Sequence, residues 1–420
     1  MMRSLFSGVA GLKSHQTRMD VIGNNIANVN TVGFKTGRVT FEDTLSQTLS
    51  GAAAATGDLG ATNPKQIGLG VGIASIDTIV TDGSINSTGK NTDLCLSGSG
   101  YFVVKNGSEN YYTRNGNFNF DPSGTFISVG SGVKVQGWTA DSSGSISTSG
   151  ATGDIVVKAG QTMAAKATTS VTFSKNLDAD TAVGGTVSST ITAYDSLGVK
   201  YSIPVTMTRK TTGTGVSGTW AATVAGTITG SDGTKLTTPA SGTTIFSANF
   251  NSSGSVTGTS TVTLAFTPTN GASALSATVD FSGLTQVSGS STLTTDYNGY
   301  TAGTLTDVNL NSQGGIVGTF SNDQKLTLAQ VAIAVFNNPS GLTKSGGSLY
   351  SSSASSGTVQ ITSAGNGGAG TITPSALEMS NVDLSEQFSD MIVTQRGFQS
   401  NSKIITVADE MIETLVNMKR

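Results

Sequence analysis

Apolar residues recur at every seventh position at both ends of this 420-residue chain. The N-terminal set is Leu5, Leu12, Met19 and Ile26, and the C-terminal set is Leu384, Met391, Phe398, Ile405 and Ile412. A seven-residue repeat of this length is typical of helices that pair as a coiled coil, and it does not fit a strand, whose side chains alternate every two residues. The two ends therefore predict long α-helices that pair with each other.

Local signals at the ends agree with this prediction. Asp383, followed three residues later by Glu386, resembles a capping box, so we expect the second helix to begin there and continue toward residue 420. We expect the first helix to end before Gly33. One face of the first helix carries small residues, namely Ser4, Ser7, Gly8, Gly11 and Ser14. Glycine inside a helix costs about 1 kcal/mol relative to alanine, so this face predicts a backbone packed close to a neighbour.

The interior of the chain has a different composition. Residues 375–420 hold 11 charged side chains, whereas the much longer stretch 141–300 holds only 15, and every Pro lies between Pro64 and Pro374. Stretches such as 199–207 alternate apolar and polar residues, and turn sequences such as Asp195-Ser-Leu-Gly198 separate them. The pattern predicts a mixed, β-dominated fold, with antiparallel β-barrel or sandwich domains inserted between the two long helices.

Several classes of chemistry are excluded by residue counts. One His and one Cys cannot build a zinc site or a disulfide within the chain. Catalysis by a Ser-His-Asp or Cys-His arrangement would need His15, which lies on a helical stripe and is expected at an interface or facing the lumen of an assembly. Cys95 is expected to be a small apolar strand residue. We therefore expect no catalytic residue, no cofactor, no metal ion and no enzymatic activity.

Two glycine-rich segments match nucleotide-binding loops only superficially. Residues 83–90 have five residues between their glycines rather than four, so a β-turn accounts for them better. Residues 68–72 precede a strand-like segment instead of following one, so they are expected to form a loop. A net charge of −3 without a basic block argues against a nucleic-acid partner.

Membrane insertion is also not expected, because the apolar runs fall short of the ~18 residues needed to span a bilayer. The first residues turn polar too early for the core of a signal peptide. If the protein leaves the cell, we expect export without a cleaved signal.

Nine segments resemble sequence blocks of the bacterial flagellar rod, hook and hook-associated proteins. The segments are 19–35 (MDVIGNNIANVNTVGFK), 41–43, 66–71, 100–104, 112–118, 135–138, 380–386, 395–398 and 408–411. The motif residues of that family fall on Asn24, Asn25, Asn28, Gly33, Phe34, Asn381 and Asp383. Together these blocks cover both parts of the chain that flank its middle.

Three further segments, 193–198, 299–305 and 331–342, are similar to hook members of the family, and a long middle module distinguishes the chain from rod members. The resemblance therefore implies a structural subunit of the flagellar hook. A secreted β-rich adhesin or glycan-binding protein remains an alternative, although it would leave the terminal heptads unexplained. Within the family, the alternative is a distal rod protein.

The resemblance implies how such a subunit works. Copies would join head to tail into a hollow, flexible helical tube, a universal joint that passes torque from rod to filament, with the heptad residues at the polymer interface. Partners would be the chain itself, the flagellar rod, hook-cap and hook–filament junction proteins, and the flagellar type III export apparatus. The implied location is extracellular, in the hook of the flagellum.

A nested domain layout follows from the resemblance and the change in composition. Residues 1–32 and 375–420 are expected to form the paired helices of an inner tube, and 33–70 with 359–374 a connecting segment. Residues 71–145 and 286–358 are expected to form an inner β-domain, and 146–285 an outer inserted β-domain.

Overall fold

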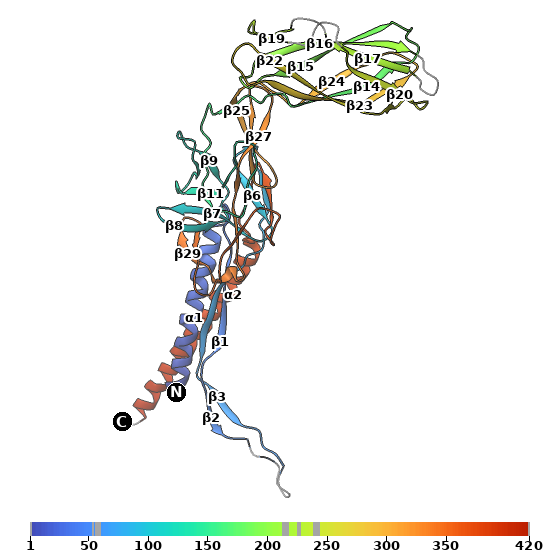
Figure 1. Cartoon of the computed structure of the whole chain (residues 1–420). Helices are drawn as coiled ribbons and strands as arrows, with labels where there is room; N and C mark the ends of the chain where they lie inside the picture. Colours follow the sequence, from blue (N-terminus) through green and yellow to red (C-terminus); the bar gives the residue numbers. More distant parts are fainter. Residues whose placement is uncertain are drawn as a thin grey trace. The chain divides into compact units, whose positions relative to one another are not determined.

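The computed structural model describes residues 2–52, 54, 60–211, 218–224, 228–237 and 244–418, and Figure 1 shows the course of the chain. The chain forms two compact units. The first comprises Met1–Ala159, Val308–Gly318 and Leu326–Arg420, and the second comprises Gly160–Asp307 and Thr319–Lys325. The limits expected for an inserted module, residues 146 and 285, stay a prediction.

Helices α1 (Met2–Ala27) and α2 (Leu384–Asn417) confirm the helices expected at the two ends. They lie side by side in the first unit (Figure 1). Asp383 caps α2, because its carboxylate accepts hydrogen bonds from the backbone N–H groups of Ser385 and Glu386. Residues 419 and 420, expected in the last turn of α2, lie outside the described residues.

Two antiparallel strand pairs follow α1. Strand β1 (Gly37–Asp43) pairs with β4 (Val71–Thr78), and β2 (Ser46–Ser50) pairs with β3 (Lys65–Gly68). The first pair packs on α1: the Ser14 hydroxyl donates to the Val71 carbonyl at 3.4 Å, and the His15 ring meets Phe41 edge-on at 5.7 Å between centroids. This pair connects the helix to the β-domain that follows.

The rest of the first unit is an inner β-domain built from both halves of the chain. Its strands are β5 (Ile85–Ser87), β6 (Leu94–Ser97), β7 (Tyr101–Asn106), β8 (Glu109–Thr113), β9 (Phe118–Phe120), β10 (Phe126–Ser128), β11 (Lys134–Thr139), β12 (Gly153–Asp154), β26 (Gly315–Phe320), β27 (Lys325–Val331), β28 (Ile333–Val335), β29 (Thr343–Gly346), β30 (Leu349–Ser351), β31 (Gln360–Thr362), β32 (Thr371–Pro374) and β33 (Ala376–Glu378), with a 3₁₀ turn at Pro339–Gly341. Its core includes Tyr101, Tyr112 and Phe336, whose rings meet edge-on. Strands β32 and β33 pair with β6 and β5, so the segment before α2 is held on this domain.

The second unit is a β-sandwich, as expected. Its strands are β14 (Ser170–Asp178), β15 (Thr186–Tyr194), β16 (Lys200–Thr211), β17 (Gly218–Val224), β18 (Ile228–Thr229), β19 (Lys235–Thr237), β20 (Thr244–Phe250), β21 (Val256–Thr257), β22 (Thr261–Pro268), β23 (Leu275–Val287) and β24 (Thr294–Tyr297). Strands β13 (Thr162–Met163) and β25 (Gly303–Leu310), at its entry and exit, belong to neither of its two sheets. One sheet has the order β18-β19-β22-β23-β14-β24 and the other β15-β16-β17-β20-β21. They share one apolar core, in which the rings of Phe246 and Phe281 stack 4.2 Å apart.

Two features of this sandwich are not apparent from the alternating pattern. Strand β14 pairs with β23 in parallel, although only antiparallel pairs were expected. The segments that enter and leave the unit also pair with each other: Thr162 lies opposite Thr304, and the Lys166 N–H donates to the Tyr300 carbonyl at 3.0 Å. The start and end of the sandwich are therefore neighbours.

Candidate functional site

The contact line between α1 and α2, which we term the seam, is held by polar side chains at the end nearest the inner β-domain. The Asn25 amide donates to Oε1 of Gln387 at 2.9 Å and to the Gly37 carbonyl at 2.8 Å, and its oxygen accepts from the Gly37 N–H at 3.0 Å. Farther along, Arg18 pairs with Asp390 at 3.1 Å. Because Asn25 and Gln387 are buried, a shift in helix register would leave their amides unpaired away from water, so these bonds fix the register.

The other half of the seam is a close approach between small residues. A Cβ added to Gly11 would lie 2.8 Å from the Asn401 side chain, and one added to Gly397 would lie 2.7 Å from the His15 ring. Gly8 faces Ile405 at an ordinary contact distance. The close backbone packing expected at the small-residue face is thus confirmed for Gly8 and Gly11.

The heptad residues flank this seam rather than fill it. Half-buried members are Leu5, Leu12, Met19, Ile26, Met391, Ile405 and Ile412. Leu384 and Phe398 are 40% and 39% exposed. The buried positions of α2 are instead Gln387, Thr394 and Ala408. A search for apolar repeats misses these residues because two of them are polar. Together with Asn401 they recur at every seventh position of α2, and that spacing could have found them.

An apolar stripe on α2 remains exposed beside the seam. Its members, at helical spacing, are Val393, Ile404, Val407, Met411 and Leu415, between 39% and 58% exposed. On α1, Phe6 and Val9 are 63% and 47% exposed. A separate line of α2 is charged: Arg396, Lys403 and Glu410 recur every seven residues and are exposed, as surface residues usually are. The helix pair therefore presents large apolar side chains that no described part of the single chain covers.

A cluster of charges lies where the helices meet the inner β-domain, and we term it the junction cluster: Lys35, Asp82, Arg114 and Glu378. The Glu378 carboxylate binds Lys35 at 2.6 Å and Arg114 at 3.3 Å, and all three side chains are 1% exposed. Asp82, 40% exposed, lies 3.5 Å from Arg114. Burial lowers the pKa of Lys35, and the hydrogen bond and charge of Glu378 oppose that shift.

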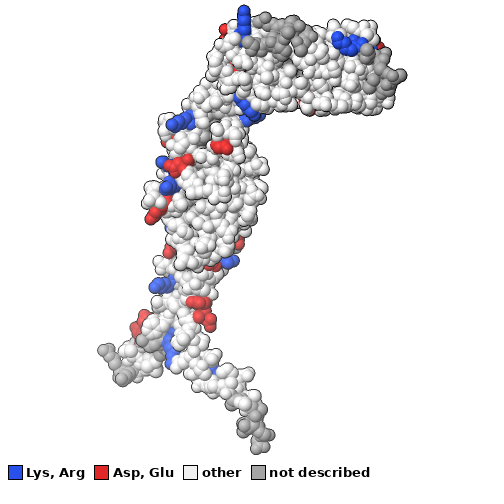
Figure 2. Space-filling model, in the orientation of Figure 1, with Lys and Arg blue, Asp and Glu red and all other residues white. Residues whose placement is uncertain are grey.

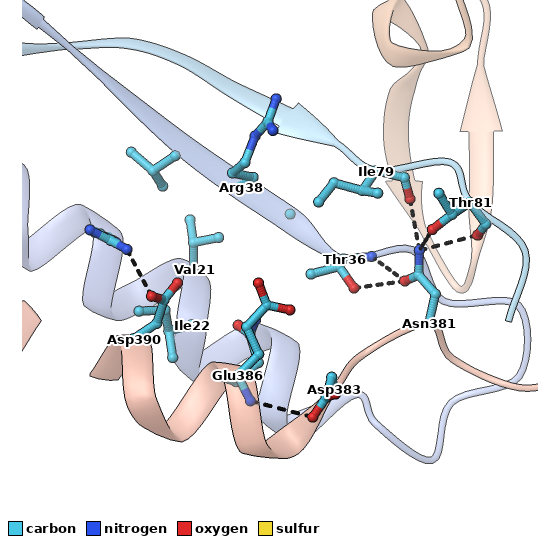
Figure 3. Close-up of a pocket in the computed structure, with 14 residues that line it drawn as sticks. Val21, Ile22, Thr36, Arg38, Ile79, Thr81, Asn381, Asp383, Glu386 and Asp390 are labelled. Atoms are coloured by element: carbon cyan, nitrogen blue, oxygen red, sulfur yellow. Dashed lines mark hydrogen bonds and ion pairs between the residues drawn. The ribbon is translucent and has the colours of Figure 1, made fainter. Parts of the chain in front are cut away.

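Asn381 joins the two connecting segments just before α2. Its oxygen accepts from the N–H and the hydroxyl of Thr36 at 2.8 and 2.7 Å, and its NH₂ donates to the Ile79 carbonyl at 3.0 Å and to Thr81 (Figure 3). A cavity beside it is lined by Val21, Ile22 and the side chains of Figure 3. Asn381 thus uses one end of its amide to hold Thr36 and the other to hold the segment that follows β4.

The remaining motif residues shape the chain after α1. The Asn28 amide donates to the carbonyl of Asn24 at 2.9 Å and to its side-chain oxygen at 2.7 Å. Gly33 has a φ of +68°, and a Cβ there would lie 2.6 Å from the Arg114 backbone. The Phe34 ring lies 5.0 Å below the Lys344 ammonium. The structure therefore places all seven motif residues where the helices meet the β-domain.

Cys95 and His15 occupy packed positions. Cys95 lies in β6, 1% exposed, and burial, followed by the charge of Glu378, raises the pKa of its thiol to about 11. Burial and the nearby Arg18 lower the pKa of His15, whose Nδ1 is buried without a hydrogen-bond partner. Residues 85–87, within the segment that resembles a phosphate loop, form strand β5.

The described part of the chain contains no group of His, Cys, Asp and Glu side chains arranged to hold a metal ion. Over the same residues, no helix combines the length and apolarity needed to cross a membrane. Charged side chains are sparse on the face of the second unit that Figure 2 shows. The exposed apolar stripe and the junction cluster are thus the chain's two distinctive features.

Four family models match the chain. They are described as flagella basal body rod protein (residues 5–35), flagellar hook protein FlgE/F/G D1 domain (95–177), flagellar basal body protein FlaE D2 domain (164–300) and flagellar basal body rod FlgEFG protein C-terminal (373–418). Both helices, the inner β-domain and the sandwich each carry a match.

Full-length relatives have the same assignment. The flagellar hook protein FlgE of Treponema pallidum is 39% identical over 468 residues, and that of Borreliella burgdorferi 40% over 462, with all of both chains covered in each case. A crystal structure of the Helicobacter pylori flagellar hook protein FlgE2 matches with a TM-score of 0.50 at 14% identity, covering 70% of this chain and 100% of that one. At that identity, the likeness concerns the fold alone.

Proposed function

The chain belongs to the flagellar hook and rod protein family and is a structural subunit of the bacterial flagellar hook, and from this premise we propose that it polymerises through the exposed apolar faces of its terminal helices. Relatives at 39–40% identity over the full chain are hook proteins, which does not favour an adhesin or a distal rod protein. The family is structural, so no enzymatic role is proposed.

The apolar stripe of α2 carries this proposal. Its five side chains are large, lie on one helix face and are 39–58% exposed in the single chain. Fully burying such a side chain contributes about 1.5–3 kcal/mol, so covering the stripe with a second copy would stabilise the contact strongly. The nine heptad residues would lie at or beside this interface, because they flank the same seam.

The form of the polymer follows from the asymmetry of such a contact. A head-to-tail contact that does not close on itself builds a helical array, and around an axis it gives a hollow tube. The paired helices would form the inner wall, with the two β-units outside. In that arrangement, long helices carry torsional load from rod to filament, and weakly charged sandwiches slide past their neighbours as the tube bends.

The domain layout and the partners extend the proposal. We propose 1–32 with 375–420 as inner tube, 33–70 with 359–374 as connecting segment, 71–145 with 286–358 as inner β-domain and 146–285 as outer domain. The tube would meet the flagellar rod, hook-cap and hook–filament junction proteins at its ends. Export would use the flagellar type III apparatus without a cleaved signal, and a chain without an internal disulfide suits passage through a narrow channel.

A charge placed in the apolar stripe tests the proposed interface. Val393→Asp and Met411→Asp should abolish polymers of the purified protein, because either change would bury a carboxylate between copies. Electron microscopy of concentrated protein measures tube formation, and circular dichroism checks that the monomer stays folded. Normal tubes from either variant would contradict the interface.

Gln399→Asp provides the matched control on the same helix. Gln399 is exposed, and its side-chain oxygen accepts from Arg396 at 3.1 Å, a role that a carboxylate can keep. This variant adds the same charge away from the stripe and should polymerise as the wild type does. Equal loss in all three variants would indicate a general charge effect instead of a defined interface.

A further inference from the structure

We propose that the two ends of the chain dock on the inner β-domain in one cooperative step, because they share the buried junction cluster. The N-terminal connector (residues 33–37) brings Lys35, the C-terminal connector (residues 371–381) brings Glu378, and the β-domain brings Arg114 and Asp82. This inference concerns the folding of the single chain and goes beyond polymerisation.

The charges of the cluster balance when both connectors are in place or when neither is, but not when one connector is docked alone. Glu378 is its one fully buried carboxylate, and it accompanies two fully buried cations, Lys35 and Arg114. If the C-terminal connector were absent, Lys35 would keep only the Thr81 carbonyl, 2.7 Å from its ammonium, as a hydrogen-bond acceptor. A buried charge without its counter-ion is strongly destabilising, so the N-terminal connector should not stay docked alone.

Backbone contacts join the same two connectors. The Gly33 N–H donates to the Glu378 carbonyl at 2.8 Å, and the Gly83 N–H donates to the Glu378 carboxylate at 3.0 Å. Asn381 on the C-terminal connector binds Thr36 on the N-terminal one. Each connector therefore completes hydrogen bonds of the other, which adds to the coupling by charge.

The order of synthesis gives this coupling a consequence. Chains are made from the N-terminus, and Glu378 follows Lys35 by 343 residues. The two cations therefore exist long before their shared counter-ion. The N-terminal helix should be held in its final position only after the last part of the chain has arrived, which would delay assembly by incomplete chains.

The single cysteine allows a direct test on the full-length monomer. Cys95 is paired with the C-terminal connector, because Thr373 of β32 lies opposite it in the sheet. Lys35 lies on the other connector. Cooperative docking predicts that Lys35→Met speeds the reaction of Cys95 with a thiol reagent by at least about tenfold, since loss of one partner of a buried pair loosens both connectors.

Electrostatics alone predicts the opposite result. The charge of Lys35 lowers the pKa of the Cys95 thiol, so its removal would raise that pKa and slow the reaction. An unchanged or slower reaction in Lys35→Met would therefore overturn the proposal. Lys134→Met is the matched control, because it removes a lysine from an ion pair of 2.8 Å that is exposed, and the Cys95 rate should stay at the wild-type value.

The reverse experiment changes the C-terminal connector and measures the protection of the N-terminal connector. Glu378→Gln keeps the side-chain shape, and hydrogen exchange should show residues 33–37 losing protection together with residues 371–381. Amides of β7 and β11 serve as the internal check that the inner β-domain of the variant is folded. Loss of protection confined to 371–381 would overturn the proposal, and so would the absence of protection at both connectors in the wild type.

Discussion

At the scale of single residues, one turn recurs in both units. An Asp or Asn accepts hydrogen bonds from the N–H groups two and four residues on, with Gly at the fourth position of the turn; these residues are Asp121, Asp141, Asp195, Asn251 and Asn311. In each, that Gly has a positive φ. Such turns are predictable from sequence because all of their interactions are local, as Asp195-Ser-Leu-Gly198 illustrates.

His15 makes the helix seam sensitive to pH. Burial and Arg18 lower the pKa of His15 in the folded seam, where the ring also contacts Phe41 of β1 and faces Gly397 of α2. Below the unfolded value of about 6.5, the unfolded chain binds a proton that the seam does not. The stability of the seam should therefore fall as pH drops through that value and level off below the lowered pKa.

Hydrogen exchange of α1 amides between pH 5 and 8 measures this effect. In His15→Gln, a neutral replacement, the dependence over that window should flatten. The same slope with and without His15 would show that another group is responsible.

At the scale of elements, two of the three glycines of α1 lie in unlike surroundings. A Cβ at Gly11 would lie 2.8 Å from Asn401, whereas one at Gly23 has nothing within 4 Å. Gly11→Ala should therefore destabilise the helix pair, and Gly23→Ala should stabilise it by up to about 1 kcal/mol through helix propensity alone. Thermal unfolding followed by helical circular dichroism distinguishes the two. Equal shifts would mean that α1 does not approach α2 at Gly11.

The helices, their cap and the strand-rich interior could be predicted because period, capping and turn signals are local. The seam could not. Gln387, Thr394 and Asn401 resemble surface residues in sequence, and their burial depends on partners in α1. The junction cluster escaped prediction for the same reason, since Lys35 and Glu378 are 343 residues apart. The parallel pairing of β14 and β23 was also not predicted, because alternation does not specify strand direction.

At the scale of the whole molecule, the second unit should be dispensable for the fold of the first. Replacing residues 164–302 by a short Gly-Ser linker removes the sandwich between its paired entry and exit segments, β13 and β25. A cut at residue 285 would instead divide β23. We expect the shortened chain to keep both helices and still polymerise, with altered stiffness or curvature.

Microscopy of the shortened protein measures tube form, and hydrogen exchange of β7 and β11 checks the inner domain. A complete loss of tubes with an intact inner domain would place the sandwich in the assembly contact itself.

The paired entry and exit of the sandwich also bear on how such chains diversify. Thr162 lies opposite Thr304, so the chain enters and leaves the sandwich at neighbouring points. Genetic exchange at these two positions would replace all the residues between them without moving the two flanking segments apart. Foreign domains with adjacent termini could be grafted at the same position. The protein is therefore suited to serve as a scaffold for repeated display of an inserted domain.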